Sequence, residues 1–120
     1  LRAMDAAMPH GAELWVDFPG DEAVELFLAE RSGRRLTRTS RSSYLIPISG
    51  DNLLMLARLV EGQPPSRLGV HVGVDHDGQR LVAAYDLDLG AINVTLSPAL
   101  PADAQRLFRR VATDSEIDLA

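Results

Sequence analysis

The sequence predicts an α+β domain in which a mostly antiparallel sheet carries helices on one face. Two hydrophobic periods support this fold class. Apolar residues recur every three or four positions in three segments, as in amphipathic helices, and every second position within 68–97, as in strands with one buried face. The expected order is β-α-β-α-β-β-β-α, in one domain of 120 residues with loose ends expected at 1–10 and 114–120.

The first half of the chain is expected to alternate strands and helices. The apolar run 14–16, which includes a tryptophan expected in the core, predicts the first strand. The segment 21–32 predicts a helix with either Asp21 or Gly20 as its cap. The β-rich segment 36–48 predicts a strand, and Pro47 indicates an edge or an end of it, because proline has no N–H to donate. A second helix, capped by an aspartate, is expected over 51–62.

The second half predicts an antiparallel meander followed by a helix. Apolar residues alternate with small or polar ones from 68 to 75, and Asp77-Gly78 is a hairpin signal. A third strand is expected over 92–97. On the return strand, the residues expected on one buried face are Leu81, Ala83, Tyr85 and Leu87. In the last helix, which opens at Pro101, the expected buried residues are Ala104, Leu107, Phe108 and Val111.

Composition excludes several classes of function. The chain has no cysteine, which removes disulfide scaffolds, zinc fingers and thiol nucleophiles. It has no apolar run near the ~20 residues that cross a bilayer, so we expect no membrane contact and a cytoplasmic location. It has no glycine-rich phosphate loop, nucleophile elbow or HExxH motif. We therefore expect no cofactor, no metal and, on balance, no enzymatic activity.

A run of arginines is the sharpest feature of charge. Arg31, Arg34, Arg35, Arg38 and Arg41 have no acid between them, and removing their five charges from the net charge of −5 leaves −10 elsewhere. Such asymmetry can mark a site for anions, nucleic acid or an acidic partner. On one continuous strand, however, Arg35 and Arg41 would share one face and Arg34 and Arg38 the other, and no aromatic residue interleaves with them. The alternative is a solvated edge that resists aggregation.

Aspartates gather at two places in the meander. Asp75 and Asp77 flank His76 at the hairpin, where they offer metal ligands but also have a sufficient role in the turn. Asp86 and Asp88 lie at the far end of the return strand, too far away to share one ion with the hairpin group. On a strand they would share a face, as a carboxylate pair for acid–base chemistry does. We favour an acidic rim for a basic partner.

His71 lies on the strand face opposite the valines, between Gly69 and Gly73. Two glycines there leave an open floor to which a ligand or another backbone can come close. If the strand register allows it, the same polar face also carries Arg80, Asp86, Asn93 and Thr95. This face is the best candidate for a binding surface, against the simpler interpretation of a solvated sheet.

Three functions follow from these features. The first is a non-catalytic acidic module that binds a protein with a basic surface, such as a bacterial immunity-type inhibitor of a basic toxin, an adaptor or a chaperone-like subunit; small size, acidity and the lack of catalytic motifs favour it. The second is a small ligand-binding domain or enzyme that uses the His71 face. The third is an anion or nucleic-acid binder that uses the arginine segment, which the acidic net charge disfavours.

Overall fold

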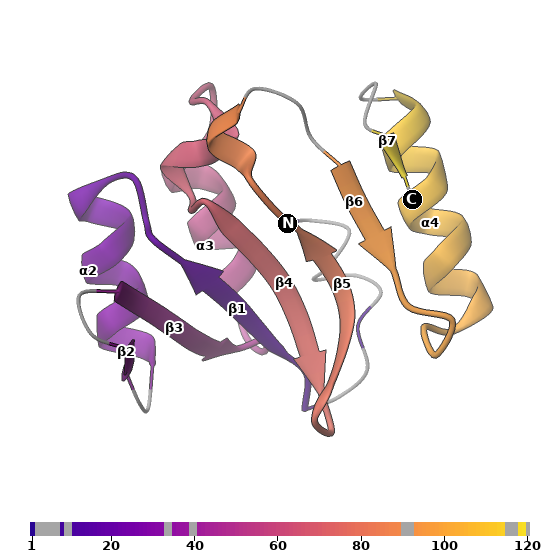
Figure 1. Cartoon of the computed structure of the whole chain (residues 1–120), viewed down its shortest axis with the longest axis horizontal. Coiled ribbons are helices and arrows are strands. Elements are labelled where there is room, and N and C mark those ends of the chain that lie inside the picture. The colour runs from indigo at the N-terminus through magenta and orange to yellow at the C-terminus, as the bar shows by residue number, and fades with distance from the viewer. Residues whose placement is uncertain are drawn as a thin grey trace.

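The computed structural model describes residues 1, 8, 11–32, 35–38, 41–89, 93–114 and 118–119 (Figure 1). Within these residues one sheet has, in spatial order, β2 (Arg35–Arg38), β3 (Arg41–Pro47), β1 (Glu13–Asp17), β4 (His71–His76), β5 (Gln79–Ala84), β6 (Asn93–Leu96) and β7 (Asp118–Leu119). Neighbouring strands are antiparallel except β6 and β7, which are parallel. The predicted α+β class, the mostly antiparallel sheet and the element order are confirmed.

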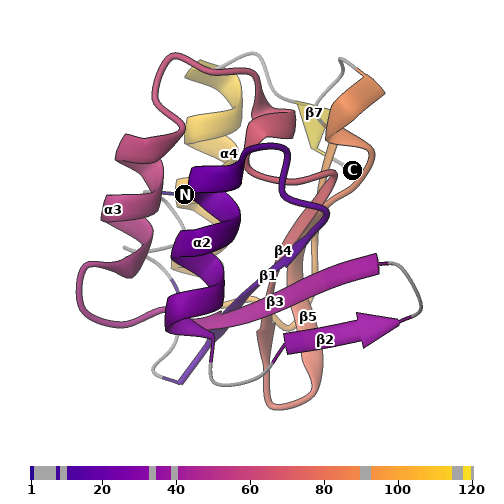
Figure 2. The same cartoon turned by 90° about the vertical axis from the view of Figure 1, so that its left-hand side faces the viewer.

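The helices α2 (Glu22–Arg31), α3 (Asn52–Leu59) and α4 (Ala102–Asp114) cover one face of this sheet (Figure 2). Two short 3-10 helices flank the β4–β5 hairpin: η1 (Pro65–Arg67) lies between α3 and β4, and η2 (Leu87–Leu89) lies between β5 and β6. α2 begins as predicted, because Asp21 accepts a hydrogen bond of 2.8 Å from the backbone N–H of Ala23. Asp51 holds the N-cap position of α3, but its side chain makes no capping hydrogen bond.

The hydrophobic core lies between the helices and the sheet. β1 contributes Leu14 and Val16, β4 contributes Val72 and Val74, and each is at most 3% exposed. The helices cover them with apolar stripes, namely Val24, Phe27 and Leu28 from α2, Leu53 and Leu56 from α3, and Ala104 and Phe108 from α4. Burial of one face of each strand follows from the alternation in the sequence. The other sheet face is turned away from the helices, and we call it the open face.

The segment 36–48 differs from the single strand that we expected. It belongs to a hairpin, in which β2 pairs with β3 in antiparallel register. Pro47 ends β3, as its missing donor predicts. A further difference is β7, which pairs with β6 in a region expected to be a loose end. The expected loose segment at 1–10 lies, apart from Leu1 and Met8, outside the described residues.

The facing predicted for the return strand β5 is correct for Leu81, and for Leu87 beyond its end, which are both in the core, but wrong for Ala83 and Tyr85. The register shifts between Val74 and Asp75, so that both Leu81 and Val82 join the core, followed by Ala84. Ala83 instead pairs with Gly73 on the open face, and Tyr85 is 45% exposed. A one-residue irregularity reverses the facing of every later residue, since side chains alternate along a strand.

Candidate functional site

A row of side chains crosses the open face at the middle of the sheet. Trp15 on β1 pairs with Leu45 on β3 and with Gly73 on β4. Gly73 pairs with Ala83 on β5, which pairs with Thr95 on β6. Directly paired residues of antiparallel strands point to the same face. The row therefore sets one large aromatic ring beside the smallest residues of the sheet.

Trp15 lies over the glycine of this row. A Cβ atom at position 73 would come within 3.1 Å of Trp15 Cε3 and 2.6 Å of the Val82 carbonyl oxygen. The indole N–H donates to the carboxylate of Asp17, with an N–O distance of 3.1 Å. Trp15 is only 8% exposed and therefore buried as expected, but it is buried on the open face and not between the sheet and the helices.

Arg80 covers Trp15. Its guanidinium carbon lies 3.7 Å from the centre of the indole ring, a cation–π contact. Two nitrogens of the same guanidinium donate to both carboxylate oxygens of Asp75, at 2.8 and 3.1 Å. This bidentate hydrogen bond raises the pKa of Arg80 above its ordinary value, with a smaller contribution in the same direction from Tyr85. The arginine is thus a fixed cation held flat on the sheet.

Three more rings join Trp15 at the start of β4 to form what we call the aromatic cluster: Trp15, Phe18, His71 and Tyr85. The His71 ring is 6.2 Å from that of Trp15 and almost parallel to it, at 16°. Tyr85 meets His71 edge-on at 5.4 Å, and Phe18 meets it edge-on at 6.4 Å. Such distances and angles are typical of interacting rings.

His71 has a defined hydrogen-bonding state. Its Nδ1 accepts a hydrogen bond of 3.1 Å from the backbone N–H of Asp86, so in this arrangement the ring proton is on Nε2. The Asp86 carboxylate lies 4.0 Å from the same Nδ1. Asp86 has a positive φ of 55°, which turns the chain out of β5 and toward His71. The sequence pattern identified His71 and Asp86, and the structure brings them together.

Asp17 is next to His71 on the neighbouring strand. It pairs in register with His71 on one side and with Ser43 on the other. The Ser43 hydroxyl donates to the Asp17 carboxylate. A serine nucleophile needs its hydroxyl on an imidazole base, with the carboxylate behind it. Here the hydroxyl is bonded to the carboxylate itself, so the arrangement does not form a catalytic triad.

Most of the predicted partner-binding residues share this surface. His71, Asp75 and Asp86 contact the aromatic cluster or Arg80. Thr95 belongs to the central row, and Asn93 lies two residues before it on the same strand, so both residues face the open side and are exposed. The register condition on which this prediction depended is therefore met.

Two predicted aspartates lie apart from this group. Asp77 is in the β4–β5 turn with a positive φ of 51°, and its carboxylate is 3.6 Å from Nδ1 of His76. Asp88 is in η2. The expectation that Asp86 and Asp88 share a strand face is wrong, because β5 ends at Ala84 and the chain there turns into a 3-10 helix. They are not a strand-mounted carboxylate pair.

The arginine segment forms the edge of the sheet at β2. Arg34 lies outside the described residues, while Arg35 and Arg38 belong to β2 and Arg41 opens β3. Because the segment is a hairpin, Arg38 pairs directly with Arg41, and the one continuous strand that was predicted here is wrong. Placement at an edge agrees with the interpretation of a charged strand that resists pairing with other chains.

Metal and membrane sites were searched over the described part of the chain. In those residues no group of three or more histidine, aspartate or glutamate side chains could hold a metal ion. None of the described helices is long and apolar enough to span a bilayer.

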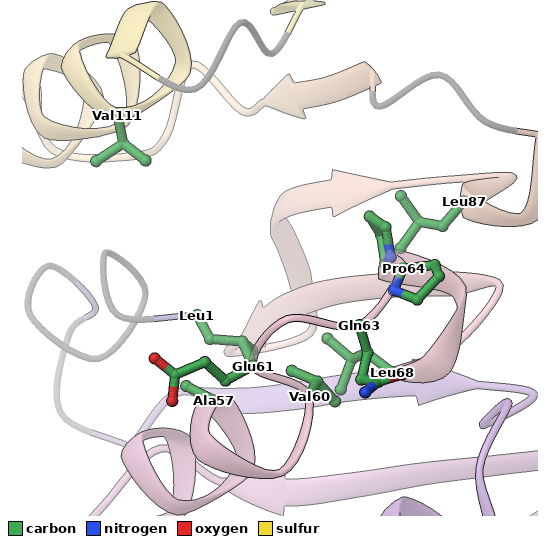
Figure 3. Close-up of a pocket in the computed structure, with 10 residues that line it drawn as sticks. Leu1, Ala57, Val60, Glu61, Gln63, Pro64, Leu68, Leu87 and Val111 are labelled. Carbon is green, nitrogen blue, oxygen red and sulfur yellow. The ribbon is translucent and has the colours of Figure 1, made fainter.

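A separate hollow lies on the helix side of the molecule (Figure 3). Its volume is about 460 Å³. Apolar side chains from α3, the following loop, η2 and α4 surround it, with Val111 facing the others across the gap. Its charged lining residue is Glu61. The hollow includes none of the predicted site residues, and its described lining lacks the converging polar groups that fix a ligand.

Sequence reasoning missed three members of the open face, namely Trp15, Asp17 and Tyr85. The available signal was the pairing of β1 with β4, which sets a tryptophan against a glycine. That pairing joins residues almost sixty positions apart, and no local pattern reports it. Comparison of the chain with protein-family models, curated proteins and solved structures finds no match.

Proposed function

We propose that the protein is a non-catalytic module that binds another protein through the open face, and that the partner's contact surface is basic. The observation that carries the proposal is the aromatic cluster beside Arg80, on the sheet face opposite the described helices. Tryptophan, tyrosine and arginine are the residues that most often dominate the binding energy of protein interfaces. An immunity-type inhibitor of a basic toxin is one protein of this class.

Rigidity of the cluster supports the proposal. Trp15 is held by Gly73, Asp17 and Arg80, and Arg80 is held by two hydrogen bonds to Asp75. Side chains that are already ordered lose little conformational entropy on binding. Tyr85, at 45% exposed, extends from this ordered base and is the natural anchor.

The charge around the aromatic cluster favours a partner with a positively charged contact surface. Asp17, Asp75 and Asp86 surround the rings, and the compensating cation Arg80 is already paired. Acidic groups at the rim of an interface accelerate association with a basic partner, and the acceleration falls as salt rises. The acidic net charge of the chain acts in the same direction.

Tyr85→Ala and Asp86→Asn test the two parts of the proposal. Asparagine at 86 removes the charge and still tolerates the left-handed backbone there. The immobilised chain captures proteins from the source cell, mass spectrometry identifies a stoichiometric partner, and surface plasmon resonance at two salt concentrations gives the rates. We expect Tyr85→Ala to accelerate dissociation by about tenfold or more, as for an interface anchor. We expect Asp86→Asn to slow association, mainly at low salt.

Two matched variants serve as controls. Val111→Ala removes a comparably exposed hydrophobic side chain from α4, on the helix side. Asp51→Asn removes the same charge as Asp86→Asn, but at the start of α3 on the helix side. Both controls are expected to keep the wild-type rates. Association and dissociation rates that change neither with salt nor in the Tyr85→Ala and Asp86→Asn variants would exclude the open face as the binding surface.

A further inference from the structure

The chain between β5 and η2 is fixed at both ends. Ala84, the last residue of β5, pairs with β4. On the other side, Leu87 is buried, and its backbone N–H donates to the carbonyl oxygen of Val70 at 2.9 Å. Only Tyr85 and Asp86 lie between these two points. A rearrangement of the turn is therefore confined to two residues, one of which is the exposed tyrosine of the aromatic cluster.

One hydrogen bond within this turn depends on the charge of an imidazole. The backbone N–H of Asp86 donates to Nδ1 of His71, with a distance of 3.1 Å between the two nitrogens. Nδ1 accepts a hydrogen bond only while the ring is neutral, because both nitrogens of a protonated ring are donors. Protonation would therefore set two N–H groups against each other at this place. The hydrogen bond that holds the turn to β4 is then lost.

The backbone of Asp86 is ready to change once that bond is lost. Its φ of 55° lies in the left-handed region, which is costly for a residue with a side chain and persists only where the surroundings hold it. Its carboxylate lies 4.0 Å from Nδ1 of His71, close enough to accept from the new N–H after a small movement. The same residue thus offers a donor to the neutral ring and an acceptor to the charged ring. Exchanging one for the other requires the turn to rotate.

The surroundings of His71 also suit a positive ring. Its charged and titratable neighbours in the described part of the chain are Asp17 from β1, Arg80 and Tyr85 from β5, and Asp86 from the turn. The two carboxylates attract a protonated imidazole, and the charge of the arginine is already paired with Asp75. The indole of Trp15 lies almost parallel to the imidazole at 6.2 Å, as in contacts between cations and aromatic faces. Both charge states of the ring therefore have favourable contacts.

We propose that protonation of His71 is a pH switch that rearranges the turn 85–86 and displaces Tyr85 from the aromatic cluster. Histidine is the side chain that ordinarily changes charge between about pH 5 and 8. The switch is a property of the free chain, and only its effect on binding rests on the proposed function. With the ring neutral, Tyr85 is in place and the Asp86 carboxylate has no counter-charge beside it. The neutral state is therefore the one that binds a basic partner, and acid releases it.

Nuclear magnetic resonance of the full chain, titrated from about pH 8 to about pH 5, tests the switch without any partner. At the alkaline end, the ¹⁵N signals of the His71 ring should place the proton on Nε2. On acidification, the backbone amide signals of Tyr85 and Asp86 should shift with the same midpoint as the ring. A proton on Nδ1 at the alkaline end, or amide signals that do not follow the ring, would overturn the proposal.

Three variants assign the response. In His71→Asn, the side-chain oxygen can take the place of Nδ1 and accept the bond without titrating, so the amide shifts should vanish. His76→Asn makes the same change near the other end of β4 and should keep them. Asp86→Asn keeps the backbone N–H but removes the carboxylate, so shifts that persist in it do not come from titration of Asp86 itself. Circular dichroism verifies that each variant is folded. Shifts that survive His71→Asn, or that vanish in Asp86→Asn, contradict the switch.

The effect on binding is measured with the captured partner by surface plasmon resonance, one pH unit above and one below the midpoint. At the lower pH roughly a tenth of the chains keep a neutral ring, so the wild type should bind about tenfold more weakly. His71→Asn meets the same titrating partner and should lack this tenfold change. An equal pH dependence of the two chains overturns the regulatory role. Failure to capture any partner contradicts the proposed function instead, because the titration of the free chain is read independently of it.

Discussion

Gly73 determines how the open face is built. With no side chain, it lets the Trp15 ring lie on the backbone of β4, and the ring in turn supports Arg80 and approaches His71. The sequence indicated that the two glycines around His71 leave a floor open to close approach. The residue that lies close to Gly73 is Trp15 of the same chain. The sequence pattern of a single strand does not predict this contact, because it depends on which strands pair.

Gly73→Ala is expected to destabilise the fold by about 1–3 kcal/mol, because the added methyl group overlaps a backbone carbonyl that has little freedom to move. The shift of Trp15 should also change the tryptophan fluorescence, and Trp15 is the single tryptophan of the chain. Urea unfolding followed by circular dichroism and by fluorescence measures both effects. An unchanged urea midpoint would contradict the close contact between Trp15 and Gly73.

At the scale of elements, periodicity predicts the helices and the meander well and the facing of individual positions less well. Val72 and Val74 are in the core as the alternation predicts. In β5, however, residues 81–84 are all apolar and all buried, so their alternation carries no information about facing. The hairpin of β2 and β3 was predicted as one strand because its turn lacks a glycine or proline signal.

In the helix α4, the observed burial differs in part from the predicted burial. Phe108 is 8% exposed and belongs to the core, whereas Leu107, expected beside it, is half-buried and Val111 is exposed. We expect Phe108→Ala to lower the free energy of unfolding by about 3–5 kcal/mol and Leu107→Ala by clearly less, since a half-exposed side chain leaves a smaller cavity. Urea denaturation of the two variants gives the comparison. A larger loss from Leu107→Ala would mean that α4 is rotated about its axis relative to the sheet.

On the scale of the whole molecule, the two faces have different chemistry. The open face is polar and aromatic, and its arginine is neutralised by an aspartate. The helix face is apolar, with complementary charges on adjacent helices. Charge counted along the sequence predicted an acidic surface and a basic segment, but not this division, because it depends on which strands and helices become neighbours.

We expect the protein not to bind nucleic acid. Among the described residues, several arginines are already in ion pairs: Arg31 with Glu30, Arg67 with Asp21, Arg80 with Asp75 and Arg106 with Asp103. Binding to phosphates depends on cations that can replace counterions, and paired arginines in an acidic chain supply few.

Fluorescence anisotropy with a labelled oligonucleotide is therefore expected to show no saturation up to roughly 100 μM protein at physiological salt, the weak limit of ordinary non-specific binding. Lowering the salt serves as the internal control, because attraction that comes from the arginine segment alone should emerge only there. Saturable micromolar binding that falls steeply with added salt would contradict the expectation. It would then assign the function to the β2–β3 hairpin, since Arg35, Arg38 and Arg41 in that hairpin have no acidic residue between them.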